Sequence, residues 1–138
     1  MAEFIQVSDS DAWDQCLVDF DYFHDSILRE AYLVSKGYVT TDHQMYDDTT
    51  LDARLIFQSQ DENAPAIELL FEGVTEFRFA AMVVFEPTME FGEGLVRLLL
   101  GGATHERRSA IVARALRYRI LGPEALGEEL AIGSVIES

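Results

Sequence analysis

The alternation of apolar and polar residues is most regular in the middle of the chain. Between residues 51 and 59, apolar side chains fall on one face of a strand and mainly polar ones on the other. Residues 60–65 have the composition of a turn, and the apolar run 66–71 predicts the returning strand of a hairpin. Another alternating run covers residues 75–79. The pattern therefore predicts three strands that follow one another closely.

The segments before this hairpin have other patterns. N-cap residues and acids precede three apolar residues at helical spacing, which are Trp13, Cys16 and Leu17. This spacing predicts a short helix over about residues 10–18. Residues 25–41 are rich in β-branched and aromatic residues and predict a long, bulged strand with mixed faces, broken only at Gly37. The polar residues 42–50 predict a loop.

The second half of the chain has a less regular pattern. Residues 80–85 continue the preceding run or form a new strand, and residues 95–100 predict another strand. A loop between them is indicated by Pro87, Gly92 and Gly94. Residues 109–121 fit both a helix and a strand, of which we favour the strand. Residues 123–130 begin with proline and an acid, which predicts a helix.

These elements predict an α+β fold, mainly antiparallel β, that is sandwich-like or built on a curved sheet, with a short helix near each end. Roughly six or seven strands joined by short turns are typical of such folds. Connections as short as residues 60–65 cannot carry the crossover that parallel strands need. A chain of 138 residues is predicted to form a single domain, 1–138.

Composition adds an asymmetry of charge. The formal net charge is −15 at pH 7, and the first hundred residues carry all of it, with twenty acids against five bases. A field of this size repels nucleic acid and anionic membranes and attracts a basic partner, although acidity can also serve solubility alone. We expect the later arginines to pair with the protein's own carboxylates; they are Arg107, Arg108, Arg114, Arg117 and Arg119.

The cysteine content and the length of the apolar runs bear on location. Cys16 is the only cysteine, so no intramolecular disulfide can form, which fits the reducing cytoplasm. The chain shows no basic signal-peptide region and no apolar run near the ~20 residues that span a bilayer. We therefore expect a cytoplasmic protein that does not bind membranes.

The most unusual local string is Phe23-His24-Asp25-Ser26. A histidine beside a carboxylate can act as a general base or bind a metal ion, so this string is a candidate site. The structural alternative, which we favour, is that Asp25 or Ser26 hydrogen-bonds the backbone of a turn while His24 packs beside Phe23. The FHDS string by itself contains too few residues to indicate a reaction.

Enzymatic activity is the less favoured hypothesis. A metal-assisted hydrolase would use His24, Asp25 and His43. The sequence has no HExxH, CxxC or calcium-loop pattern, and Glu93 between two glycines opposes a bound phosphate. A thiol pair of Cys16 and His24 is weak, because a cysteine on an apolar helix face is usually inert. We predict no cofactor and no catalytic residue.

The chain resembles small uncharacterised bacterial proteins that carry an FHDS segment. The resemblance lies in the FHDS string, in residues 51–58 and in residues 66–74. They are also distantly similar to the FHD-motif immunity proteins of polymorphic toxin systems. The resemblance covers about residues 13–80. It implies a β-rich cytoplasmic protein without enzymatic activity that neutralises a toxin by direct binding. The charge agrees, because toxins that act on nucleic acid are commonly basic.

The leading hypothesis is a non-catalytic acidic protein, of the immunity type, that binds a basic, toxin-like protein. Its predicted binding face consists of exposed acids, which are Asp42, Asp47, Asp48, Asp52, Asp61 and Glu62. A further hypothesis is a self-assembling structural subunit. In that case residues 95–100 or 82–85 form an edge strand that pairs with another copy.

Overall fold

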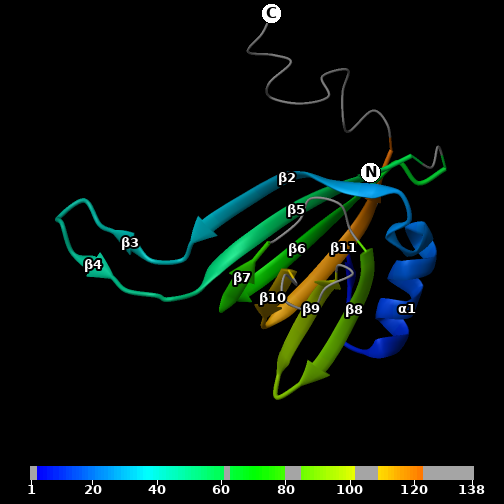
Figure 1. Cartoon of the computed structure of the whole chain (residues 1–138). Helices are drawn as coiled ribbons and strands as arrows, with labels where there is room; N and C mark the ends of the chain where they lie inside the picture. The colour runs from blue at the N-terminus through cyan, green and yellow to red at the C-terminus, as the bar shows by residue number, and fades with distance from the viewer. Residues whose placement is uncertain (1–2, 61–62, 80–84, 102–108, 123–138) are drawn as a thin grey trace, which may run out of the picture.

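Antiparallel strands form most of the fold in the computed structural model, which describes residues 3–60, 63–79, 85–101 and 109–122 (Figure 1). Helix α1 spans Ser10–Asp19, and a single 3-10 turn, η1, spans Asp21–Phe23. The longer strands are β2 (Ser26–Ser35), β5 (Leu51–Ser59), β6 (Ala66–Val74), β8 (Phe85–Gly92), β9 (Leu95–Gly101), β10 (Ser109–Ala113) and β11 (Ala115–Leu121). The short strands are β1 (Ile5–Gln6), β3 (Tyr38–Val39), β4 (Met45–Tyr46) and β7 (Glu76–Arg78).

Two sheets enclose the core of the protein. The first sheet has the strand order β1-β11-β6-β5-β2, and the second has the order β7-β10-β9-β8. Strands β3 and β4 form a separate ribbon. Every ladder among the described strands is antiparallel, as their short connections require. The predicted α+β, mainly antiparallel fold is confirmed.

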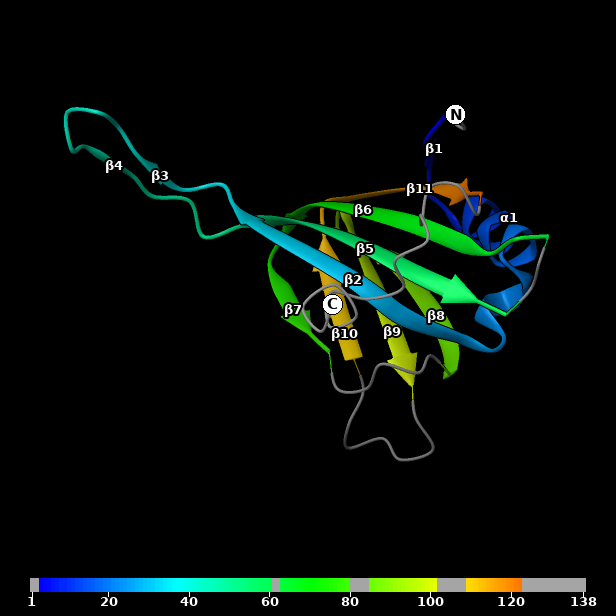
Figure 2. The same cartoon turned by 90° about the horizontal axis from the view of Figure 1, so that it is seen from above.

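Two strands pass from one sheet to the other at a shared corner. Strand β6 continues into β7, and β10 continues into β11, so their ladder bends between Glu72 and Thr75 (Figure 2). At the bend the Arg114 N–H donates to the Glu72 carbonyl at 3.0 Å. Gly73 has a φ of +63°, in the left-handed region that favours glycine. The bend lets this one pair of strands contribute to both sheets.

We expect Gly73→Ala to lower the free energy of unfolding by about 1–2 kcal/mol. A Cβ atom there would strain a left-handed backbone and approach the Arg114 side chain to 3.0 Å. Gly92→Ala is the matched control, because its Cβ would meet nothing within 4 Å. Urea titrations followed by circular dichroism measure both variants. Equal stability of the two would show that the corner does not depend on glycine.

The core lies between the sheets and beneath α1. Large buried side chains come from both sheets and from the segment that follows α1, and they include Phe20, Phe23, Phe57, Phe71, Leu98, Ile111, Leu116 and Tyr118. Helix α1 confirms the predicted segment, with Asp9 as N-cap accepting from the Ala12 N–H at 2.9 Å. Trp13 and Cys16 are buried as their spacing predicts, and the Tyr118 hydroxyl donates to Asp19 at 2.7 Å. The helix therefore closes one end of the core.

Some predicted elements differ in the structure. The expected loop around Pro87 is strand β8, because Pro87 lies at a register shift on an edge strand, where a missing N–H is tolerated. The favoured strand over 109–121 is confirmed, although it is divided at the corner into β10 and β11. The predicted helix over 123–130 lies outside the described residues. No helix in the described part of the chain is long and apolar enough to cross a membrane.

Of the two edge strands expected for self-assembly, the one over residues 95–100 is wrong. Residues 95–100 belong to β9, which lies between β10 and β8 and is therefore an interior strand. Of residues 82–85, only Phe85 is described, as the start of β8, which is an edge strand of the second sheet. The apolar run of β9 is explained by its burial in the sheet, which is typical of central strands.

Candidate functional site

A hairpin arm, residues 36–50, projects from the body of the protein between β2 and β5 (Figures 1 and 2). Its strands remain in register, since the Lys36 N–H donates to the Thr50 carbonyl at 3.2 Å and β3 pairs with β4. Near the tip, the Thr40 N–H donates to the Gln44 carbonyl at 2.8 Å. The arm thus extends the hairpin of β2 and β5 beyond the two sheets.

Local polar contacts fix both ends of the hairpin arm. At the tip, the Thr40 carbonyl accepts from the His43 N–H at 3.0 Å, and the Thr40 hydroxyl bonds to Asp42. At the base, the Asp48 carboxylate accepts from the Thr50 N–H at 2.8 Å and from its hydroxyl at 2.7 Å. These bonds lower the pKa of Asp48. The arm's own sequence therefore stabilises its shape.

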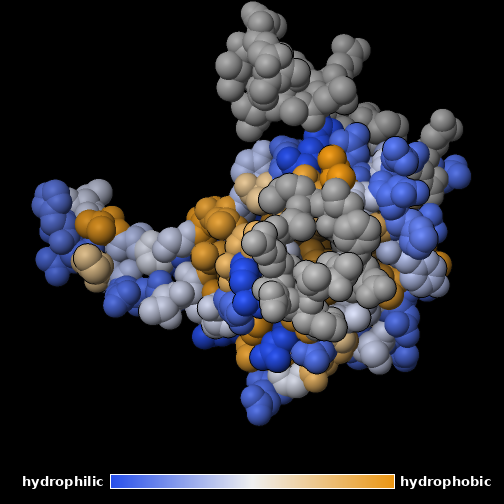
Figure 3. All heavy atoms as spheres, viewed as in Figure 1, coloured by the Kyte–Doolittle hydropathy of each residue, from blue (hydrophilic) through white to orange (hydrophobic). Residues whose placement is uncertain are grey.

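The apolar side chains of the hairpin arm are exposed. The rings of Tyr38 and Tyr46 stack at 4.9 Å between centroids, and yet each side chain remains more than half exposed. Val39 is 60 % exposed and Met45 is 76 % exposed. Figure 3 shows hydrophobic residues on the arm and again where it joins the body. Clustered apolar exposure of this kind marks interaction surfaces.

The exposed apolar surface continues along β2. Tyr32, Leu33 and Val34 are between 47 % and 64 % exposed. The Arg54 guanidinium lies over the Tyr32 ring at 5.3 Å, and the Tyr32 hydroxyl donates to Glu30 at 2.6 Å, which raises the pKa of Tyr32. Sequence reasoning missed this exposure, because apolar residues on both faces of a strand usually indicate burial. The long polar segment 42–50, which follows this strand, was the feature of the sequence that could have indicated a projecting arm.

The acids predicted to bind a partner fall into three groups. Asp42, Asp47 and Asp48 all lie on the hairpin arm and are exposed. Asp52 lies at its base, where it pairs with Lys36 at 3.6 Å and accepts from the Gly73 N–H at 3.1 Å. Asp61 and Glu62 lie outside the described residues. The structure therefore brings half of the predicted set together on one projecting element.

The FHDS string forms the connection from η1 to β2. Phe23 is 1 % exposed in the core, and the buried Ser26 hydroxyl donates to the Phe23 carbonyl at 2.7 Å. His24 and Asp25 are exposed, whereas Phe23, beside which His24 was expected to pack, is buried. Phe23 and Asp25 have φ values of +59° and +49°. The contacts of Phe23 and Ser26 are those of a structural turn.

The alternative metal site is not formed. His24 and Asp25 precede β2, whereas His43 lies at the tip of the hairpin arm beyond its other end. A ten-residue strand is about 33 Å long, so these residues do not share a site. Among the described residues, no group of three His, Cys, Asp or Glu side chains is arranged to hold a metal ion. Cys16 is fully buried, and burial raises the pKa of its thiol, as expected for an inert cysteine.

The arginines of β11 pair with carboxylates of β6, as the charge balance predicted. Arg117 contacts Glu72 at 2.6 Å, and Arg119 contacts Glu68, which also bonds to Arg54. Glu68 is 1 % exposed, so two guanidinium groups share one buried carboxylate. Arg107 and Arg108 lie outside the described residues. The positive charges of Arg117 and Arg119 are therefore balanced by carboxylates of the same chain.

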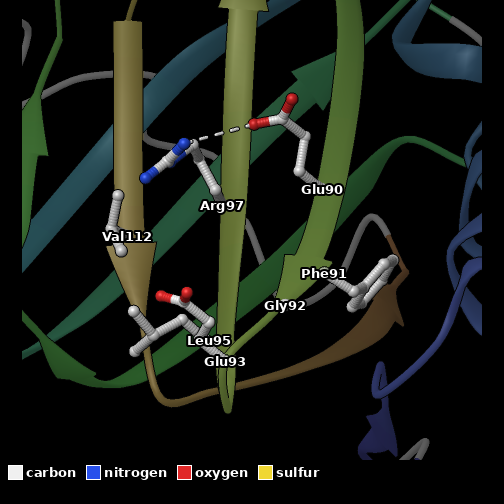
Figure 4. A pocket seen from close by; sticks show the side chains of 7 residues that line it. All are labelled: Glu90, Phe91, Gly92, Glu93, Leu95, Arg97 and Val112. Carbon is white, nitrogen blue, oxygen red and sulfur yellow. Dashed lines mark hydrogen bonds and ion pairs between the residues drawn. The ribbon is translucent and has the colours of Figure 1, made fainter.

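A hollow of about 380 Å³ lies beside the β8–β9 hairpin (Figure 4). Its lining residues are Glu90, Phe91, Gly92, Glu93, Leu95, Arg97 and Val112. Arg97 pairs with Glu90 at 3.4 Å, and both side chains are more than half exposed. An exposed pair of this kind is readily solvated, and the carboxylate of Glu93 opposes an anionic ligand. The hollow therefore does not favour an anionic ligand.

The hairpin arm is the most distinctive candidate for an interaction site in the described part of the chain. It combines exposed apolar side chains with exposed acids on a projecting element. Comparisons of the chain with protein-family models, with curated protein sequences and with solved structures found no match.

Proposed function

We propose that this chain is a non-catalytic binding protein whose hairpin arm engages a basic protein partner. The observation that carries the proposal is the composition of the arm. It projects with four large apolar side chains exposed and with Asp42, Asp47 and Asp48 beside them. Lys36 is its only basic residue, apart from His43. Apolar contacts surrounded by charge are typical of protein recognition.

The net charge supports a basic partner in particular. A chain with a net charge of −15 attracts a positively charged protein over long distances and accelerates its association. Within this function we infer an immunity-type role in the cytoplasm, in which the acidic arm covers the nucleic-acid-binding surface of a toxin-like protein. The competing explanation is that the acids only maintain solubility. The two explanations differ in whether the position of the charge matters.

Charge reversal on the arm tests the proposal. The purified protein captures partners from host lysate at low salt, and mass spectrometry identifies them. For a captured basic protein, we expect Asp42→Lys with Asp47→Lys to lower the association rate about tenfold or more at low salt. The difference should fall as salt rises, because ions screen exposed charges. Stopped-flow fluorescence measures these rates.

The matched control reverses two acids on another element. Asp11→Lys with Asp14→Lys changes the net charge equally, and both residues are exposed on α1. We expect this variant to keep most of the association rate. A control variant that loses as much as the arm variant would show that only the total charge matters. Binding that does not respond to salt would contradict the role of the acids.

A further inference from the structure

We propose that two copies of this chain pair through β2, antiparallel about a two-fold axis at Leu33, and join their first sheets into one continuous sheet. This self-association goes beyond the proposed binding of a basic partner and does not depend on it. It uses the β2 and β3 side of the hairpin, which includes Tyr38 and Val39, and leaves the tip and the returning strand, with Met45, Tyr46 and the acids Asp42, Asp47 and Asp48, to the basic partner.

Strand β2 is a long edge whose residues 31–35 lack the usual protection, and its interruption is confined to the register shift between Leu28 and Glu30. Of the described strands, only β5 pairs with it. Natural edge strands are usually short, charged or interrupted by proline or bulges, since a free edge can pair with another chain. Among the other described edges, β1 has two residues, β7 has three, and β8 is interrupted at Pro87. Strand β2 has ten residues, no proline, and no charge from 31 to 35.

The backbone of β2 offers hydrogen-bonding groups at alternate residues. The Lys36 N–H donates to Thr50, so the backbone of Lys36 faces the β5 side. The register between β2 and β5 is regular from Glu30 to Ser35. Because backbone direction alternates along an antiparallel strand, the groups of Ala31, Leu33 and Ser35 point away from β5. A two-fold axis at Leu33 opposes Leu33 to itself and Ala31 to Ser35, so these groups face one another.

The same register matches the side chains. It places Tyr32 opposite Val34 and Glu30 opposite Lys36, each pair twice by symmetry. Opposite charges and apolar pairs across neighbouring strands stabilise a sheet. Residues 26–41 carry only Arg29, Glu30 and Lys36 as charged residues, in a chain with a net charge of −15. A contact through this segment therefore avoids the acidic surface and is complementary to a second copy.

The hairpin arm fits the same arrangement. Strand β3 of each copy runs along the first half of β2 of the other copy. Gly37, where the strand breaks, falls opposite Arg29, where the register of β2 shifts between Leu28 and Glu30. Val39 then lies opposite Ile27, and these side chains are 60 % and 47 % exposed in the single chain. Association covers apolar surface that each copy leaves in water.

A cysteine at the symmetry axis tests the register directly. Two opposed residues in a hydrogen-bonded antiparallel pair have Cα atoms about 5.5 Å apart, within the range of a disulfide. We expect Leu33→Cys to form a covalent dimer under mild oxidation through the two introduced cysteines. The native Cys16 is fully buried and does not compete with them. Val18→Cys, 56 % exposed on α1, is the control and should remain monomeric. Equal cross-linking of both variants would overturn the register.

Sedimentation equilibrium tests the association without a covalent link. We expect the wild-type protein to reach the dimer mass below roughly 100 μM, and Leu33→Lys to raise the dissociation constant about 100-fold. Val18→Lys, with the same change of charge, should not. A wild-type chain that does not pair with a second copy would overturn the proposal, even if its β2 edge pairs with another protein. So would a dimer that Leu33→Lys leaves intact.

A charge swap provides a rescue. Glu30→Lys and Lys36→Glu each place like charges opposite one another and should raise the dissociation constant about tenfold. The double variant restores opposite charges and should recover most of the affinity. These side chains are on or next to the exposed part of β2, and circular dichroism verifies that each variant is folded. Additive losses in the double variant would exclude the pairing of Glu30 with Lys36.

Discussion

Glu68→Gln is expected to lower the free energy of unfolding by about 3 kcal/mol. Glu68 lies on β6 and is 1 % exposed between Arg54 of β5 and Arg119 of β11. The substitution keeps the shape of the side chain but removes its charge. Two guanidinium groups then share a neutral partner that supplies only one acceptor oxygen. The Arg54 side chain is 43 % exposed, so water screens part of this loss.

Glu72→Gln is the control for this prediction. Glu72 also lies on β6 and pairs with an arginine of β11, but it and Arg117 are each 41 % exposed. An exposed pair contributes about 0–1 kcal/mol. Urea titrations of both variants, followed by circular dichroism, give the two differences in stability. Similar losses would show that burial of Glu68 between two arginines does not set its contribution.

Phe23→Ala is expected to lower the free energy of unfolding by about 4 kcal/mol. Phe23 is fully surrounded by core residues and packs edge-to-face with Phe20 at 4.9 Å and with Phe57 at 5.5 Å. Its ring also stacks on Trp13 at 6.1 Å. Removing it leaves a cavity where α1, η1 and β5 meet. The edge-to-face contacts of the ring with Phe20 and Phe57 are lost at the same time.

His24→Ala tests which residues of the FHDS string support the fold. His24 is exposed, so the stability should change by less than about 0.5 kcal/mol. Ser26→Ala removes a buried hydrogen bond and should fall between the two, at about 1–2 kcal/mol. A large loss for His24→Ala would show that this exposed side chain also supports the turn, and a small loss for Phe23→Ala would contradict the structural role of the string. Thermal unfolding measured on all three variants gives the order.

Local pattern predicted those parts of the fold that depend on near neighbours. The hairpin of β5 and β6 follows from alternation before a polar turn and an apolar run after it, and α1 follows from capping residues and apolar spacing. The arginine pairs of β11 followed from charge balance alone. The bend at Gly73 and the strand containing Pro87 were not predicted, because each is favoured by its position in a sheet.

The candidate site was predicted only in part. Asp42, Asp47 and Asp48 were identified from charge, and the structure places them on the projecting hairpin arm. The exposed residues Tyr38 and Met45 were not identified, because alternation does not say whether a strand lies inside a sheet or beyond it. The expected metal ligands His24, Asp25 and His43 lie beyond opposite ends of β2 in the structure. Their positions in the sequence do not show how far apart the two ends of this strand are.

The sequence by itself determined that this chain forms antiparallel strands, a helix over about residues 10–18 and an acidic surface, because periodicity, capping and charge are local or additive properties. Only the tertiary structure decided which strands became edges, that Glu68 is enclosed by two arginines, and that the apolar side chains of β2 remain exposed. Periodicity states which residues share a face of a strand. What that face meets depends on strand order, which is set by contacts between residues distant in the chain.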